Sequence, residues 1–141
     1  MMDSVEIMNF VTDEEKMAGL GYKPEHLFAL VIRNTYEMWW TVSVEKLMQR
    51  LKKENDAFWN ANERRVKAER LGLTIPEVIT LASIVEEETN YQPEKSRVAG
   101  LYLNRLRKGI RLQSDPTVKF ALKDFTLNRI LFEHLKVDDP Y

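Results

Sequence analysis

Residues 74–89 constrain the fold most, because they carry the signals of one complete amphipathic helix. Thr74 and Glu77 match the T-x-x-E capping box, and Pro76 lies in the first turn, where its missing N–H has no helical partner to lose. The apolar side chains recur at the spacing of one helix face: Val78, Leu81, Ala82 and Val85. We therefore predict a helix over residues 75–89 that buries this face.

Start and stop signals divide most of the remaining chain into further helices. Ser43 is a good N-cap for a long helical region, and Gly72 and Gly109 are expected helix ends. The helical segments predicted in this way cover residues 4–10, 12–20, 44–71 and 93–108.

Three regions carry weaker signals. A helix within residues 26–40 is expected to enter a short strand around residues 30–32. Asp115 is the expected N-cap of a short helix that begins with Pro116, and residues 124–135 are expected to form a last helix. The sequence thus predicts a predominantly helical chain.

Composition excludes several classes of protein. The net charge of the 141 residues is −1, so there is no electrostatic case for a nucleic-acid partner. The chain has no cysteine, and its two histidines, His26 and His134, share no ligand spacing with acidic residues. We therefore expect no metal site. No apolar run approaches the roughly 20 residues of a membrane span, and the chain is expected to be a segment of a longer protein.

Three adjacent carboxylates, Glu86, Glu87 and Glu88, lie at the C-terminal end of the first helix, where negative charge is unfavourable. At about 100° per residue, only Glu88 continues the apolar face. A buried carboxylate beside other negative charges retains its proton more readily, as a general acid requires. A solvated acidic run, or pairing with Lys95 or Arg97, is the more common arrangement, so spacing alone does not decide between the two.

Longer motifs resemble a known family. The stretches "LASIVEEETN" (81–90) and "RVAGLYLNRLRKGIRLQSDPTVKFAL" (97–122) contain the S-I-V-E-x-E-T, N-R-L and L-Q-[ST]-D-P-T-V patterns of the YceG-like (MltG) endolytic murein transglycosylases of bacteria. The strong match covers about residues 73–122. A looser match extends to "IRNTYEMWW" (32–40), where Arg33 replaces the usual proline.

The resemblance implies an activity and a catalytic residue. Members of this family cleave the β-1,4 bond between N-acetylmuramic acid and N-acetylglucosamine within glycan strands, without water, and leave 1,6-anhydromuramyl ends. Their catalytic glutamate directly precedes Thr in E-x-E-T, which is Glu88 here. Ordinary glycosidases use a second carboxylate. In this family the muramyl C6 hydroxyl takes that part intramolecularly, and no cofactor is implied.

Four further residues are candidates for substrate binding. Gln113 and Asp115, in the L-Q-S-D-P-T segment, are expected to bind or orient the sugar, together with Thr117 and Asn104. Three of these residues have a structural alternative. Asp115 and Thr117 fit the start of a helix, and Asn104 fits a residue that holds a loop in place.

The resemblance also implies an organisation and partners. Residues 1–72 would be a helical part that leads from a LysM-like region into the catalytic domain, and residues 73–141 a truncated catalytic core. The expected class is α+β, with little sheet in this piece. The parent protein is expected to be anchored in the inner membrane, to act on peptidoglycan strands on the periplasmic, extracytoplasmic side, and to contact cell-wall synthases.

One alternative to this enzyme remains, and a second is not supported. The chain would otherwise be a non-catalytic peptidoglycan-binding or scaffold module of cell-wall synthesis. An aminodeoxychorismate lyase would need a pyridoxal phosphate site with a phosphate-cradling glycine loop, and the sequence has no such loop. The segment alone is expected to be inactive or nearly so.

Overall fold

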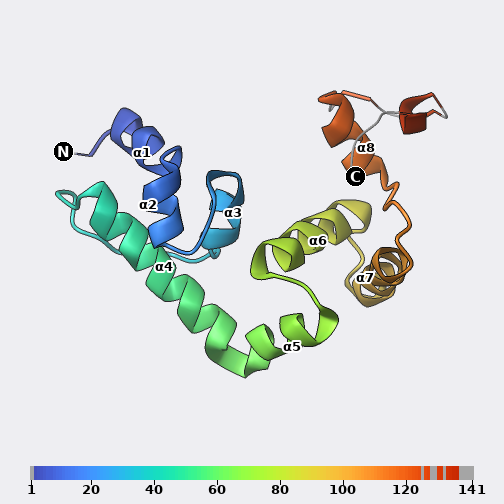
Figure 1. Cartoon of the computed structure of the whole chain (residues 1–141), viewed down its shortest axis with the longest axis horizontal. Coiled ribbons are helices and arrows are strands. Elements are labelled where there is room, and N and C mark those ends of the chain that lie inside the picture. The colour runs from blue at the N-terminus through green and yellow to red at the C-terminus, as the bar shows by residue number, and fades with distance from the viewer. Residues whose placement is uncertain (1, 125, 128–129, 132, 137–141) are drawn as a thin grey trace. The chain divides into compact units, whose positions relative to one another are not determined.

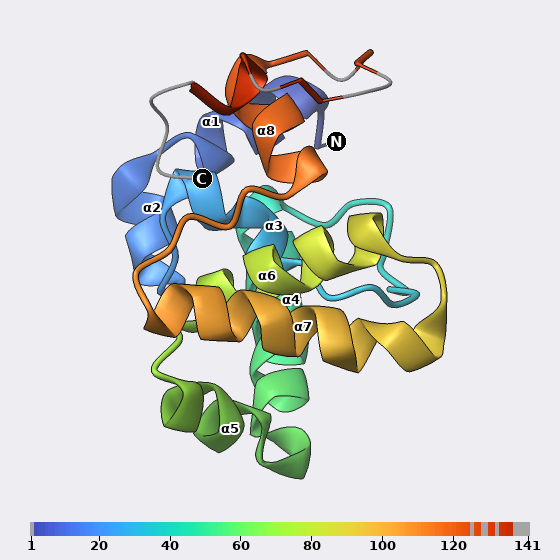
Figure 2. The same cartoon turned by 90° about the vertical axis from the view of Figure 1, so that its right-hand side faces the viewer.

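The computed structural model describes residues 2–124, 126–127, 130–131 and 133–136. These residues form helices and connecting loops, with no strand among them (Figures 1 and 2). The chain divides into two compact units, residues 1–77 and 78–141. Each unit is described by itself.

The first unit contains five α-helices among its described residues: α1 (Ser4–Val11), α2 (Glu14–Gly19), α3 (Leu27–Leu30), α4 (Val44–Asn60) and α5 (Arg64–Leu71). The helix α6 (Ile75–Glu88) begins in this unit and continues into the second. The second unit also holds α7 (Gln92–Arg107), α8 (Asp115–Leu122) and the short 3₁₀ helix η3 (His134–Lys136).

Local signals account for most helix ends. Ser43 accepts a hydrogen bond from the N–H of the third residue of α4, which confirms the expected N-cap, and Asp13 caps α2 in the same way. Gly72 and Gly109 adopt left-handed backbone at φ 71° and 64°, as expected of residues that end helices. The long region predicted over residues 44–71 is helical apart from a break between α4 and α5.

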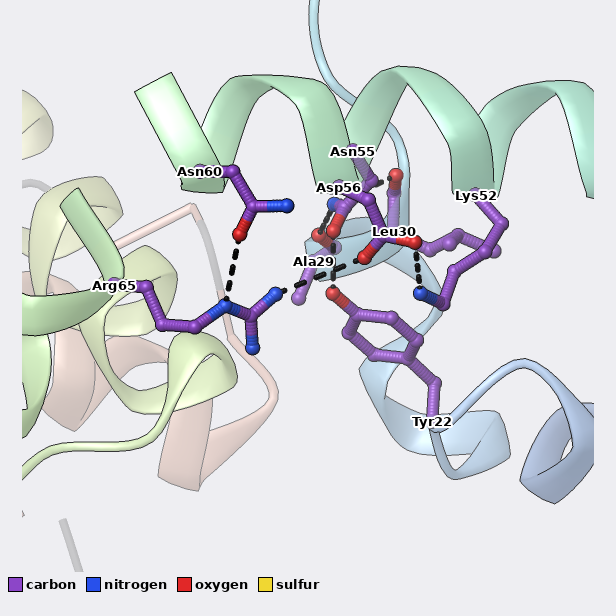
Figure 3. A network of polar contacts seen from close by, with 8 residues as sticks. All are labelled: Tyr22, Ala29, Leu30, Lys52, Asn55, Asp56, Asn60 and Arg65. Atoms are coloured by element: carbon purple, nitrogen blue, oxygen red, sulfur yellow. Dashed lines mark hydrogen bonds and ion pairs between the residues drawn. The ribbon is translucent and has the colours of Figure 1, made fainter. Parts of the chain in front are cut away.

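The core of the first unit is built on one face of α4. Its buried residues recur at helical spacing, and they are Val44, Met48, Leu51, Asn55 and Trp59. Asn55 has no exposed surface. The hydroxyl of Tyr22 donates to Asn55 Oδ1 at 2.8 Å, and Asn55 Nδ2 donates to the carbonyls of Ala29 and Leu30 at 2.8 and 3.0 Å (Figure 3). One side chain therefore joins α4, the end of α3 and the segment that precedes α3.

The predicted strand around residues 30–32 is wrong. Helix α3 ends at Leu30, and residues 31 and 32 have no regular structure. The carbonyls that a strand would offer to a neighbour are partly taken by Asn55, more than twenty residues later in the chain. Since buried carbonyls need a partner, this side chain satisfies the backbone in place of a sheet.

The last predicted helix, over residues 124–135, is also wrong for its described residues. Helix α8 ends at Leu122, and Lys123 has left-handed backbone at φ 55°. The Asp124 carboxylate then accepts hydrogen bonds from the N–H and hydroxyl of Thr126, at 3.0 and 2.6 Å. Such local bonds compete with a helix. Residues 125, 128, 129 and 132 lie outside the described residues.

Candidate active site

Helix α6 begins as its sequence predicts. The Thr74 N–H and hydroxyl both donate to Glu77 Oε2 at 2.7 Å, and the Glu77 N–H donates back to Thr74 Oγ1 at 3.4 Å. The bonds from Thr74 hold the pKa of Glu77 below its usual range. The capping box is thus confirmed.

The buried face of α6 differs in part from the predicted one. Its buried residues are Leu81, Ile84 and Val85, whereas Ala82 is exposed and Val78 is half-buried. The face is centred closer to Ile84 than expected, since the large side chain packs in preference to the small one.

Glu88 is the last residue of α6 and is exposed, together with Glu86 and Glu87. The expectation of a buried Glu88 is therefore wrong. Glu88 follows Ile84 and Val85 in helical phase, but it lies at the end of the helix and its side chain remains accessible. Lys95 pairs with Glu86 at 4.0 Å, so the base expected as a partner of an acidic residue here pairs with Glu86.

Helix phase nevertheless brings Glu88 to a specific partner. Tyr102 of α7 is 5% exposed, and its hydroxyl donates to Glu88 Oε1 at 2.9 Å. Both views show α7 beside α6 (Figures 1 and 2). Burial, then the hydrogen bond and the charge of Glu88, raise the pKa of Tyr102 to about 12, against the opposing effects of Ser114 and Arg105. Tyr102 therefore stays protonated near neutral pH and acts as a donor.

The L-Q-S-D-P-T segment is bound to the same helix. The guanidinium of Arg105 donates to the Arg111 carbonyl at 2.8 Å and to Gln113 Oε1 at 2.9 Å. Gln113 is exposed and has left-handed backbone at φ 51°. Because Tyr102 and Arg105 are three residues apart, they lie near each other on one side of α7. Their partners, Glu88 and Gln113, are thus brought to one region of the second unit.

Ser114, not Asp115, caps α8. Ser114 has extended backbone, its hydroxyl accepts from the Thr117 N–H at 3.4 Å, and Asp115 already lies within the helix. The prediction of Asp115 as N-cap is wrong by one residue. Asp115 is exposed, whereas Thr117 is buried and donates its hydroxyl to the Ser114 carbonyl at 2.8 Å.

Asn104 is not brought together with Glu88. It is exposed on α7, and two residues correspond to about 200° around a helix, so it lies on the opposite side from Tyr102. Tyr102 itself was not a candidate from sequence. A signal existed, since a tyrosine among apolar helix residues needs a partner for its hydroxyl when buried.

The described residues contain no cluster of histidine and acidic side chains that could hold a metal ion. Over the same residues, no helix is long and apolar enough to span a membrane.

Comparison with known sequences decides the family. The model of the YceG-like family matches residues 3–141, almost the whole chain. The chain belongs to the YceG-like family. The resemblance inferred from the E-x-E-T and L-Q-S-D-P-T motifs is thereby confirmed.

Similar YceG-like proteins include two curated relatives. The endolytic murein transglycosylase of Bacillus subtilis (strain 168) is 28% identical over 99 residues, which are 70% of this chain and 27% of the relative. That of Streptococcus pneumoniae serotype 2 (strain D39) is 28% identical over 131 residues, 89% of this chain and 23% of the relative. The chain thus spans about a quarter of the length of the curated relatives it matches. No solved structure matches it.

Proposed function

We propose that this chain carries the catalytic glutamate of an endolytic peptidoglycan lytic transglycosylase. It would cleave the bond from N-acetylmuramic acid to N-acetylglucosamine within glycan strands and leave 1,6-anhydromuramyl ends. The observation that supports this most is the exposed Glu88 carboxyl group, one oxygen of which accepts the Tyr102 hydroxyl. Membership of the YceG-like family and the names of its relatives agree with this activity.

The reaction needs one residue that gives and then takes a proton. In the proposed mechanism, Glu88 donates its proton from Oε2 to the glycosidic oxygen as the bond from muramyl C1 to that oxygen breaks. The muramyl C6 hydroxyl then attacks C1, and its proton passes to the Glu88 carboxylate. The new bond joins C1 and O6 of one sugar, so the nucleophile is intramolecular and no water is consumed. Glu88 ends the cycle protonated, as it began.

Different roles follow for the four candidate binding residues. Gln113 and Asp115 are exposed at the start of α8 and are proposed to contact the glycan. Thr117 is buried, and its hydroxyl is bonded to Ser114, so we assign it to holding the helix start. Asn104 is exposed on the other side of α7 from Tyr102 and would contact sugar only at a more distant subsite.

The organisation of the whole protein remains part of the proposal. Residues 1–72 would lead from a LysM-like region into the catalytic domain, whose core would begin at residue 73. The complete catalytic domain would be of the α+β class. The protein would act on the extracytoplasmic face of the membrane that anchors it, on peptidoglycan strands and in contact with cell-wall synthases.

Digestion of purified glycan strands tests this function. The intact protein that carries this chain would be compared with its Glu88→Gln and Glu87→Gln variants. Glu87 is a matched control, since it is the adjacent exposed carboxylate on α6. We expect Glu88→Gln to lower the rate of anhydromuramyl formation at least about 100-fold, and Glu87→Gln to leave it within about 2-fold. A Glu88→Gln protein that cleaves at the wild-type rate would refute the assignment. Glycan binding without cleavage by the wild-type protein would favour the scaffold module.

A further inference from the structure

Arg105 lies between two parts of the loop that precedes α8. Its Nε–H donates to the Arg111 carbonyl at 2.8 Å, and one terminal nitrogen donates to the Gln113 side chain at 2.9 Å. Arg105 is half-buried on α7, and the Gln113 side chain is exposed. One guanidinium therefore fixes both the path of the loop and the end of the Gln113 side chain.

This contact sets the direction of the Gln113 amide. A guanidinium has only hydrogen-bond donors, so the only atom of the Gln113 amide that can accept from it is the carbonyl oxygen, Oε1. The Nε2 group of Gln113 must then point away from Arg105, with its two N–H donors on the exposed side. An unpaired glutamine could turn its amide over, but Gln113 cannot do so while Oε1 is held.

The backbone of Gln113 is consistent with an imposed geometry. Its φ of 51° lies in the left-handed region, which costs free energy for a residue with a side chain. Arg111, two residues earlier, is bonded to Arg105, and Ser114, the next residue, is the buried N-cap of α8. The loop is thus restrained where it presents this amide.

A fixed donor distinguishes between the groups of a glycan. Hydroxyl groups both donate and accept, so they pair with an amide in either orientation. The N-acetyl carbonyl only accepts, and it needs the N–H side. Both sugars of peptidoglycan carry an N-acetyl group, so an outward donor edge fits this substrate.

We propose that Arg105 is a positioning residue that fixes Gln113 as a hydrogen-bond donor for an N-acetyl carbonyl of the glycan. This inference rests on the proposed function for its substrate. Arg105 itself does not touch the sugar and acts through Gln113.

Binding without cleavage provides the test. In the intact protein carrying Glu88→Gln, the affinity for a GlcNAc–MurNAc tetrasaccharide would be measured by calorimetry, alone and with Gln113→Glu, Arg105→Met or both. The glutamate retains an oxygen for Arg105 but loses the N–H donors. Each single variant should weaken binding about 10-fold, the value of one hydrogen bond. The double variant should weaken it no further, because both changes remove the same interaction.

Two controls make the result specific. Arg107→Met removes the same charge two residues along α7, where the side chain is exposed, and should leave the affinity within about 2-fold. A tetrasaccharide without N-acetyl groups should bind the parent about 10-fold more weakly and should not distinguish Gln113 from Gln113→Glu. Unchanged affinity in Arg105→Met, an equal loss in Arg107→Met, or additive losses in the double variant would overturn the inference.

The outcome is separable from that of the proposed function. If Glu88→Gln still cleaves at the wild-type rate while the Arg105 and Gln113 effects hold, the catalytic assignment fails and the positioning role stands. If Glu88 is required but Arg105→Met binds normally, the reverse holds. If the tetrasaccharide does not bind the Glu88→Gln protein, the positioning inference fails, and digestion of glycan strands still decides the catalytic assignment. The NMR signals of the terminal N–H groups of Arg105, one of which donates to Gln113, should shift in Gln113→Glu, and unshifted signals would show that the pairing does not exist in solution.

Discussion

The Tyr102 hydroxyl of α7 donates a 2.9 Å hydrogen bond to Oε1 of Glu88, at the last residue of α6. Tyr102 is buried and is held by its neighbours, whereas Glu88 is exposed. The hydrogen bond therefore restrains the Glu88 carboxylate against a fixed tyrosine. Because Oε1 already accepts this bond, the proposed mechanism assigns the proton exchange with substrate to the other oxygen, Oε2.

The first prediction concerns the Tyr102 hydroxyl. Tyr102→Phe retains the buried ring and removes only the donor, so Glu88 gains rotational freedom. We expect kcat to fall about 10-fold, the effect of one hydrogen bond, with KM unchanged within about 2-fold. The control is Tyr91→Phe, at an exposed tyrosine of the same unit. Equal kcat values for Tyr102→Phe and the wild type would show that the hydroxyl does not restrain Glu88 during the reaction.

The second prediction is an ionisation. Burial is the largest cause of the raised pKa of Tyr102, about 12, and the hydrogen bond and charge of Glu88 add to it, so Glu88→Gln should lower that pKa part of the way toward 10. A tyrosine whose pKa is raised by folding stabilises the folded state below pH 10, and this stabilisation is lost as the pH rises toward 12. The change would be followed by NMR of the labelled Tyr102 ring carbon. A Tyr102 pKa that is the same in both proteins would exclude the hydrogen bond in solution.

The third prediction concerns the core of the first unit. Asn55→Ala leaves the Tyr22 hydroxyl and the carbonyls of Ala29 and Leu30 without their partner. Because these buried polar groups would lose their hydrogen bonds, the free energy of unfolding should fall by about 2–4 kcal/mol. Urea denaturation would measure it. Asn60→Ala, at an exposed residue bonded to Arg65, should cost less than about 1 kcal/mol. Similar losses of unfolding free energy in Asn55→Ala and Asn60→Ala would contradict a stabilising role for the Asn55 hydrogen bonds.

The fourth prediction separates two neighbouring residues at the start of α8. Ser114→Ala removes the hydroxyl that accepts the Thr117 N–H, and should cost about 1 kcal/mol of stability. Asp115→Ala should cost less than about 0.5 kcal/mol, since Asp115 lies inside the helix and is exposed. Thermal unfolding of both variants checks this order. A larger loss of stability in Asp115→Ala would indicate that Asp115, not Ser114, is the N-cap.

How far the sequence predicts the structure depends on the range of the interaction. The T-x-x-E box of Thr74 and Glu77 and the left-handed stop at Gly72 lie within a few residues, and both were predictable. The partner of the α3 carbonyls was not, because Asn55 is far along the chain. The short strand predicted in its place rested on apolar content alone, which helices and buried loops share.

The candidate site divides in the same way. Helical phase and the motif both indicated Glu88, and phase does bring it to Tyr102. Its burial was overestimated, because phase gives the direction of a side chain but not what covers the end of a helix. The pairing of Arg105 with Gln113 joins a helix to a loop with left-handed backbone, and no spacing rule indicates it.

The most direct test of the central claim is the fate of solvent oxygen. Glycan strands would be digested by the intact protein in water labelled with heavy oxygen, and the new ends analysed by mass spectrometry. We predict 1,6-anhydromuramyl ends that contain no solvent label and that disappear in the Glu88→Gln variant. Labelled reducing ends, or unlabelled anhydro ends at an undiminished rate in Glu88→Gln, would contradict the proposal that Glu88 alone drives cleavage without water.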